Sequence, residues 1–180
     1  MMTADQAREL WASSEEIVSA EEVQQSLDRM ASEITDKMGN DFPLVLSVMG
    51  GAVVFTGMLL PKLQFPLEFD YIHLSRYNNK TVGGEMQWRV APRESVKDRV
   101  VLVLDDILDE GETMAAIRQR IMDMGAKEFH AAVLCEKTLT KLKPMHPDFC
   151  GFKVPDRYVF GCGMDVKGYW RNLGTIRALV

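Results

Sequence analysis

One run of thirteen residues, 101–113, constrains the fold of this chain more than any other part of it. Residues 100–104 are uninterrupted aliphatic residues, which is typical of a strand covered on both faces of a parallel sheet. Two adjacent acids, Asp105 and Asp106, follow where that strand is expected to end. A tight turn then leads into a helix expected over 114–124, and the first N–H groups of a helix attract anions because they have no intrahelical partner. The run therefore predicts an anion site beyond a buried strand.

Strands and helices alternate along the rest of the chain, which at 180 residues is long enough for one domain. The expected elements are a helical region over 3–38, strands at 43–49, 66–77, 85–90, 129–135 and 148–160, a short helix at 52–60 and an irregular tail over 164–180. A polar segment, 76–84, has the composition of a mobile loop. The alternation predicts an α/β fold, a doubly wound, mainly parallel sheet flanked by helices.

Composition excludes several classes of function. The chain has 21 Lys and Arg residues against 26 Asp and Glu residues, and this net charge of −5 argues against a general nucleic-acid-binding surface. We expect no membrane partner, because no apolar stretch approaches the ~20 residues of a membrane helix. The first residues lack the apolar core of a secretory signal, so a cytoplasmic protein is expected. Cys135, Cys150 and Cys162 have no zinc or redox spacing, and we expect them to be reduced and buried.

Three segments fall at the expected carboxyl ends of strands. They are residues 48–51, residues 105–113 and Lys137. Ligands of open parallel sheets bind beyond the carboxyl ends of the strands. The pattern therefore predicts one shared pocket.

The run 101–113 resembles the phosphoribosyl pyrophosphate motif of the type I phosphoribosyltransferases, and residues 44–173 are similar to the hypoxanthine-guanine branch of that family. The resemblance implies a single domain over 1–180 with a core at about 40–160. It also implies a small hood formed by the N-terminal helix region and residues of about 161–180. Members of the family are usually homodimers or homotetramers, so an oligomer is expected.

The resemblance assigns roles within the motif. Substrate contacts would come from Asp105, Asp106, Ile107, Leu108, Glu110, Gly111, Glu112 and Thr113. Asp105 and Asp106 would hold the ribose hydroxyls directly or through Mg²⁺, and residues 110–113 would wrap the 5′-phosphate. Asp109 would face the purine as the catalytic residue.

Further segments match other elements of the family. The matching residues are Met49, Gly50 and Gly51 in the pyrophosphate loop, Tyr77 in the flexible loop, Lys137, Tyr158 and Val159 around the base, and Asp165 and Arg171 near pyrophosphate. Many members have Lys where this chain has Met49, and a cis peptide bond between Val48 and Met49 would fit the family. Tyr77 would help to close the site, although Arg76 and Asn78 depart from the usual Ser and Gly.

The resemblance also implies how the base is recognised. Lys137 would donate to the 6-oxo group, Tyr158 would stack on the ring and Val159 would read the ring edge through its backbone. Asp165 would bind a second Mg²⁺, and Arg171 would reach pyrophosphate oxygens.

The implied reaction is transfer of a 5-phosphoribosyl group from phosphoribosyl pyrophosphate to N9 of hypoxanthine or guanine, in purine salvage. Two alternatives stay open at this stage. The base could be another one, such as xanthine, adenine or a pyrimidine. The chain could also be a non-catalytic regulator of the same fold that binds nucleotides and RNA, which the acidic composition does not favour.

Overall fold

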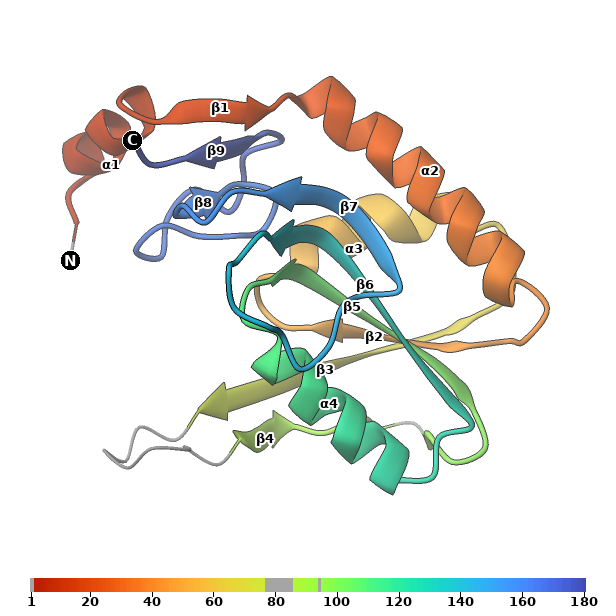
Figure 1. Ribbon diagram of the computed structural model, residues 1–180. Coiled ribbons are helices and arrows are strands. Elements are labelled where there is room, and N and C mark those ends of the chain that lie inside the picture. Colours follow the sequence, from red (N-terminus) through yellow and green to blue (C-terminus); the bar gives the residue numbers. More distant parts are fainter. Residues whose placement is uncertain (1, 77–85, 94) are drawn as a thin grey trace.

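The computed structural model describes residues 2–76, 86–93 and 95–180 (Figure 1). In chain order the elements are α1 (Ala4–Ala12), β1 (Glu15–Val18), α2 (Ala20–Met38), β2 (Leu44–Val48), α3 (Val53–Leu59), the 3-10 helix η1 (Leu60–Lys62), β3 (Glu68–Arg76), β4 (Met86–Val90), β5 (Val100–Leu108), α4 (Glu112–Asp123), β6 (Glu128–Lys137), β7 (Phe149–Val154), β8 (Val159–Phe160) and β9 (Ile176–Ala178). Within the described residues, the strands form a six-stranded sheet of order β4-β3-β2-β5-β6-β7 and a three-stranded sheet of order β1-β9-β8.

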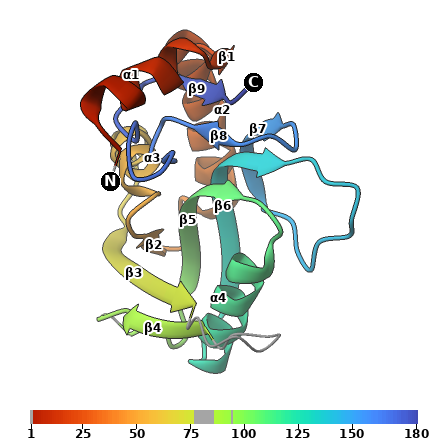
Figure 2. The same ribbon diagram turned by 90° about the vertical axis from the view of Figure 1, so that its left-hand side faces the viewer.

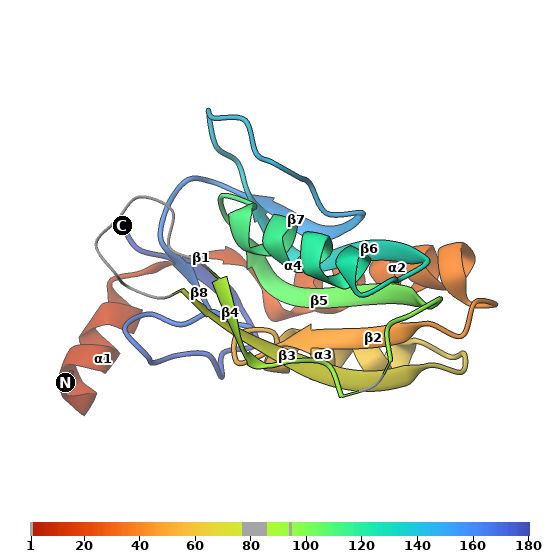
Figure 3. The ribbon, with the colours of Figure 1, turned by 90° about the horizontal axis from the view of Figure 1, so that it is seen from below.

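The larger sheet is mainly parallel, as the sequence predicts. β2, β3, β5, β6 and β7 pair in parallel, and only β4 runs antiparallel to its neighbour β3. Helices cover both faces: α2 and α3 lie on one side and α4 on the other, along β5 and β6 (Figures 1 and 3). Side chains of β5 alternate accordingly, with Leu102 and Leu104 in the core under α2 and α3, and Val101 and Val103 in the core under α4. The prediction of a doubly wound α/β fold is confirmed.

Helix α2 shows how local sequence fixes one of these layers. Ser19 and Glu22 form a reciprocal capping box that starts the helix. Its apolar stripe is fully buried against the sheet, and consists of Val23, Leu27, Met30, Ile34 and Met38. Burying each such side chain stabilises the fold by about 1.5–3 kcal/mol. Helix α2 also contacts the edge strand β7, because Arg29, near the middle of the helix, donates to the carbonyls of Cys150 and Gly151.

The prediction of one helical region over 3–38 is wrong in its middle, because β1 separates α1 from α2. The Ser19 cap ends the extended segment before it, and β1 pairs antiparallel with β9, about 160 residues away in the chain. The tail over 164–180 is likewise not wholly irregular, since it contains β9. Local periodicity cannot show a pairing between such distant segments.

The strand predicted over 148–160 is two strands that belong to different sheets. β7 pairs with β6 in the larger sheet, whereas β8 pairs with β9 in the smaller one. Pro155 separates them because proline has no N–H group to continue a ladder, and a turn closed by Arg157 N and Pro155 O redirects the chain.

The smaller sheet gathers both ends of the chain beside the ends of β5 and β6 (Figure 2). Arg157 connects its parts, donating to the carbonyl of Leu179 and pairing with Glu15 at 2.6 Å. The indole N–H of Trp170 donates to the carbonyl of Ala7 at 2.8 Å, which holds α1 against the C-terminal segment. Across the described ranges, the helices are too short or too polar to span a membrane.

Asp70 supplies a pH-dependent stabilisation of the sheet. Burial alone would raise the pKa of this carboxyl, but hydrogen bonds from the backbone N–H groups of Arg93 and Tyr71, and the Arg93 guanidinium, lower it below 3.8. A lowered pKa stabilises the fold above the unfolded-state value and loses that effect as pH falls through the folded-state value. We expect Asp70→Asn to reduce the free energy of unfolding by about 1–3 kcal/mol at neutral pH.

Urea unfolding from neutral pH to below pH 3.8 measures this effect, and the difference from the wild type should shrink at the acidic end. Asp36→Asn, at an exposed position of α2, is the matched control and should stay within about 0.5 kcal/mol. A difference for Asp70→Asn that is constant with pH would contradict the role of its charge.

Candidate active site

Strand β5 carries two acids to the edge of the sheet. It continues to Leu108, beyond the end predicted at residue 104, because Asp105 and Ile107 still pair with Val133 and Cys135 of β6. Each acid accepts from the next backbone N–H group, Asp105 from residue 106 at 3.0 Å and Asp106 from residue 107 at 2.8 Å. Burial raises the pKa of both carboxyls, and the neighbouring Asp106 charge raises that of Asp105 further. Two desolvated carboxylates side by side favour a cation between or beside them.

A tight turn joins β5 to α4 and forms a first cavity. Gly111 has φ of 82°, a left-handed conformation that glycine adopts without strain, and the helix begins at the next residue. The cavity of about 270 Å³ is lined by Asp105, Ile107, Leu108, Asp109, Glu110, Gly111, Glu112, Thr113 and Met114. It therefore lies at the N-terminus of α4, where backbone N–H groups and the helix dipole favour an anion. Glu110, which would oppose an anion, pairs with Lys141, and this hydrogen bond raises the pKa of Lys141.

A second cavity adjoins the first. Its volume is about 230 Å³, and it is lined by Asp106, Ile107, Asp109, Lys137, Tyr158, Val159, Met164 and Asp165. The two cavities share Ile107 and Asp109. Lys137, at the end of β6, lies with its Nζ 2.8 Å from the Asp109 carboxylate and 4.0 Å from that of Asp156. The second cavity thus combines the Lys137 ammonium, three carboxylates, an aromatic side chain and the edge strand β8.

The loop after β2 packs between the acids and the C-terminal segment. A Cβ atom on Gly51 would lie 2.0 Å from Asp106 Oδ2, and a Cβ atom on Gly163 would lie 2.1 Å from the carbonyl oxygen of Gly51. Both approaches require glycine. The non-proline cis peptide bond predicted between Val48 and Met49 lies instead between Met49 and Gly50. Met49 N donates to Ile72 O of β3, so the contact with β3 extends to the residue before the cis bond.

Arg171 and Asp165 face the cavities from the C-terminal segment. Arg171 Nη2 lies 2.6 Å from Asp165 Oδ1, and its Nη1 donates to the carbonyl of Gly163 at 2.6 Å. The positive charge of Arg171 also favours ionised Asp106. Tyr158 donates from its hydroxyl to the carbonyl of Asp165 at 3.1 Å, which orients the half-exposed ring.

Most of the predicted site residues therefore come together, but not all. Gly51 and Arg171 adjoin the cavities through Asp106 and Asp165, whereas Met49 and Gly50 line neither cavity. Tyr77 lies outside the described residues. The sequence prediction missed Gly163, Met164 and Lys141. The alternating glycines at 161 and 163 were the signal in the sequence for the first of these, and in the structure both have positive φ.

The cysteines do not contribute reactive groups to this site. Cys135 and Cys162 are buried, Cys150 is half-buried, and all three are free. Burial raises the pKa of the Cys162 thiol to about 11 and that of Cys135 well above its ordinary value. These thiols stay protonated at neutral pH, which agrees with the expected packing role of Cys135 and Cys162.

The fold and the two cavities define a doubly wound α/β domain in which a cavity at a helix N-terminus adjoins a second cavity lined by polar groups and an aromatic side chain. Residues 13–167 match the family described as the phosphoribosyl transferase domain. The chain is 32% identical over 164 residues to the hypoxanthine-guanine phosphoribosyltransferase of Bacillus subtilis, covering 91% of each chain. It is also 32% identical to the hypoxanthine-guanine-xanthine phosphoribosyltransferase of Tritrichomonas foetus, covering 91% of this chain and 90% of the relative.

Solved structures of related proteins have the same fold. A structure of a hypoxanthine-guanine-xanthine phosphoribosyltransferase superposes with a TM-score of 0.83 at 30% identity, over 92% of this chain and 96% of that one. A hypoxanthine phosphoribosyltransferase from Staphylococcus aureus gives a TM-score of 0.89 at 23% identity, over 100% and 97% of the chains, which supports the fold. The chain belongs to the phosphoribosyltransferase family, in its hypoxanthine-guanine branch.

The close contact between Gly163 and Gly51 can be tested against a matched glycine. We expect Gly163→Ala to lower the free energy of unfolding by roughly 1–3 kcal/mol more than Gly168→Ala, because of the added steric overlap. Both glycines have positive φ, +105° and +89°, so both variants suffer backbone strain, but a Cβ atom meets other atoms only at residue 163. Chemical unfolding of both variants measures the difference. Equal losses would show that the contact with Gly51 imposes no constraint.

Proposed function

We propose that the protein transfers the 5-phosphoribosyl group of phosphoribosyl pyrophosphate to N9 of hypoxanthine or guanine, forming the nucleoside monophosphate and releasing pyrophosphate. The observation that carries this proposal is the pair of adjoining cavities that share Ile107 and Asp109. One has the helix N-terminus suited to a phosphate, and the other has the polar and aromatic groups suited to a base. A nucleoside monophosphate presents these two parts at opposite ends of a ribose.

Recognition of the base is assigned to three residues of the second cavity. The Lys137 ammonium would donate to the 6-oxo group of the purine, Tyr158 would stack on the ring and the Val159 backbone would contact the ring edge. A 6-amino purine presents a donor to the ammonium, and a buried donor without an acceptor costs about 1–3 kcal/mol or more. This arrangement favours hypoxanthine and guanine over adenine.

Asp109 is the proposed catalytic residue. Its carboxylate lies 2.8 Å from the Lys137 ammonium, so a base held by Lys137 would lie within reach of Asp109. The carboxylate would accept the proton of the purine N7 as N9 attacks C1 of the ribose. Holding the two substrates in line supplies a large further share of the rate enhancement, up to about 7–11 kcal/mol.

Residues 110–113 and the acids hold the other substrate in this proposal. The turn and the first N–H groups of α4 would bind the 5′-phosphate, with the Thr113 hydroxyl as a further donor, and Asp105 and Asp106 would hold the ribose hydroxyls. Arg171 would contact the pyrophosphate with its planar fork of donors. The loop Met49–Gly51 would present backbone N–H groups to the same pyrophosphate.

The acids fit Mg²⁺ as a cofactor. Their oxygen ligands are those that Mg²⁺ prefers, and burial raises the pKa of Asp105 and Asp106, an effect that a bound cation would offset. Among the described residues no three His, Cys, Asp or Glu side chains form one metal site, which agrees with an ion held by one or two carboxylates and substrate oxygens. Asp105 and Asp106 would hold one ion and Asp165 a second. When bound, the ions would neutralise charge on the leaving pyrophosphate.

Xanthine is the second candidate base. The similar Tritrichomonas foetus relative bears xanthine in its name, and the 2-position of the purine would meet backbone groups that do not exclude an oxygen. The proposal further places the protein in the cytoplasm, as a homodimer or homotetramer.

An ultraviolet assay with phosphoribosyl pyrophosphate and hypoxanthine, guanine, xanthine, adenine or uracil tests the proposal. We expect turnover of hypoxanthine and guanine that disappears when a chelator removes Mg²⁺, because two desolvated acids then lose their counter-charge. Strong turnover of adenine would overturn the role of Lys137. Binding of phosphoribosyl pyrophosphate without turnover of any base would favour a regulator of the same fold.

Replacement of Asp109 tests its role in proton transfer. We expect Asp109→Asn to lower kcat by about 10²–10⁴-fold with little change in KM, because asparagine keeps the shape of the side chain but cannot take a proton at neutral pH. Steady-state kinetics with hypoxanthine measure both constants. Asp156→Asn is the control, since this exposed carboxylate also lies near Lys137 but lines neither of the two cavities that share Asp109. Unchanged turnover in Asp109→Asn would remove the residue from the mechanism.

A further inference from the structure

Lys143 is a buried lysine in the loop between β6 and β7. Its side chain is only 4% exposed. Its Nζ lies 2.5 Å from the carbonyl oxygen of Lys137, 3.4 Å from that of Leu108 and 3.6 Å from the carboxylate of Glu136. An ammonium group has three donors, and here it faces three acceptors. Burying an ammonium is costly unless its donors are satisfied, so this arrangement fixes the side chain in place.

The two carbonyls belong to the last residues of neighbouring strands. Leu108 ends β5 and Lys137 ends β6, and the last paired residues of the two strands are Leu108 and Glu136. Lys143 therefore connects the carbonyl groups at the ends of the two strands, where the hydrogen-bonded ladder between them stops. Asp109 directly follows Leu108, whose carbonyl is one of the two acceptors. The other acceptor is the carbonyl of Lys137 itself, and the Lys137 side chain lines the second cavity.

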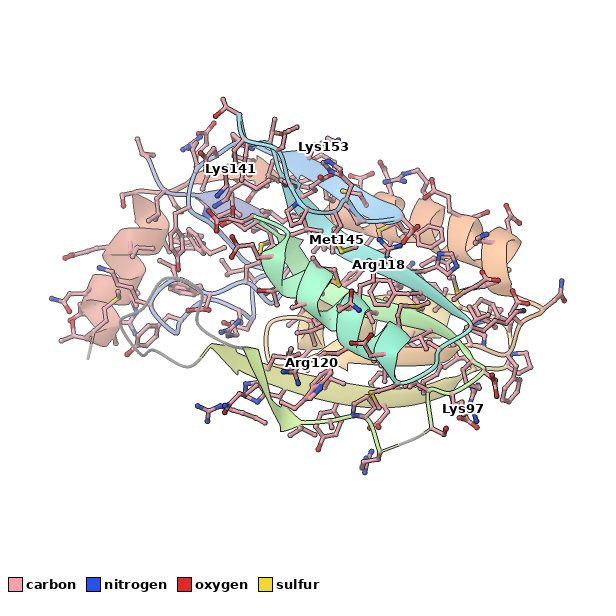
Figure 4. All side chains as sticks on the ribbon, turned by 60° about the horizontal axis from the view of Figure 1, so that its bottom comes forward. Lys97, Arg118, Arg120, Lys141, Met145 and Lys153 are labelled. Atoms are coloured by element: carbon pink, nitrogen blue, oxygen red, sulfur yellow. The ribbon has the colours of Figure 1, made fainter. Side chains whose placement is uncertain are left out.

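The loop that contains Lys143 is itself fastened to the site. Glu136 is 4% exposed and also contacts His146 Nδ1 at 2.5 Å and Lys153 Nζ at 3.5 Å. Figure 4 shows Lys141, Met145 and Lys153 around this loop, between α4 and β7. The carbonyl oxygen of Met145 would lie 3.1 Å from a Cβ atom on Gly111, so the loop packs on the turn before α4.

We propose that Lys143 is a positioning residue that fixes the distance between Asp109 and Lys137. This inference rests on the proposed function, in which these two side chains bind the base and move its proton. Lys143 touches neither substrate. It holds the backbone on which both groups are mounted, and a displacement of about 1 Å in such groups lowers turnover by about 10²-fold.

Variants of Lys143 test this role. We expect Lys143→Met to raise KM for the base and to lower kcat/KM for the base by about 10²-fold, while KM for phosphoribosyl pyrophosphate changes less than about twofold. Lys143→Arg, which keeps the charge and several donors, should recover part of the loss. A purely structural role would lower the active fraction, and hence kcat, without changing either KM, so that pattern would overturn the proposal.

Lys153→Met is the matched control. It removes a lysine from the same Glu136 carboxylate, but its side chain is 73% exposed and reaches neither carbonyl. Its kinetic constants should stay within about twofold of the wild type. A loss equal to that of Lys143→Met would assign the effect to the charge of Glu136 and overturn the bridging role.

Hydrogen–deuterium exchange tests the same bridge without relying on turnover. Peptides that span 106–112 and 135–140 should exchange faster in Lys143→Met than in the wild type and in Lys153→Met, while peptides from α2 stay unchanged. If the wild type turns over no base, the proposed function fails but the exchange result still decides whether Lys143 fastens the strand ends. Unchanged exchange in both peptides would overturn the inference.

Discussion

The parallel pairing of β5 with β6 is the constraint on which the site depends. Its rungs run from Val100 and Glu128 to Leu108 and Glu136, and they bring Asp109 and Lys137 to adjacent strand ends. A slip of one residue would turn every side chain of β5 to the opposite face, which would exchange its aliphatic residues between the two differently shaped cores and point Asp105 and Asp106 away from the groups they now face. Burial of the aliphatic runs and placement of the polar groups are therefore set by one register. The packing of the hydrophobic core therefore also determines where Asp109 and Lys137 lie relative to each other.

Much of this arrangement follows from local sequence. The aliphatic run before Asp105 identifies a buried strand, and the capping box at Ser19 with its apolar stripe identifies α2. Because parallel strands place their carboxyl ends along one edge, polar residues that follow them can be assigned to one site from the order of residues alone. For this reason Asp109 and Lys137, 28 residues apart in the chain, could be predicted to converge, and they form an ion pair.

The features that escaped prediction depend on contacts between distant segments. β1 and β9 are only four and three residues long, and their pairing joins residues 15–18 to residues 176–178. Neither segment has a distinctive period of its own. Lys143 lies in the run Lys141-Leu142-Lys143, where composition alone indicates solvated lysines. Its burial arises only after the loop has folded back onto the strand ends, as its contact with the Leu108 carbonyl illustrates.

The second cavity has walls from two different sheets, and this has a consequence for alterations at the ends of the chain. Lys137 ends β6 of the larger sheet and Asp109 directly follows β5 of that sheet, whereas Tyr158 and Val159 lie at the start of β8, whose only neighbour in the smaller sheet, among the described residues, is β9. Val180 is 96% exposed, so an affinity tag joined there would extend into solvent. A deletion that extends a few residues further would instead remove β9, and with it the strand that pairs with β8 beside Tyr158. Trimming of either terminus would thus disturb the wall formed by Tyr158 and Val159, although neither terminus lines the cavity.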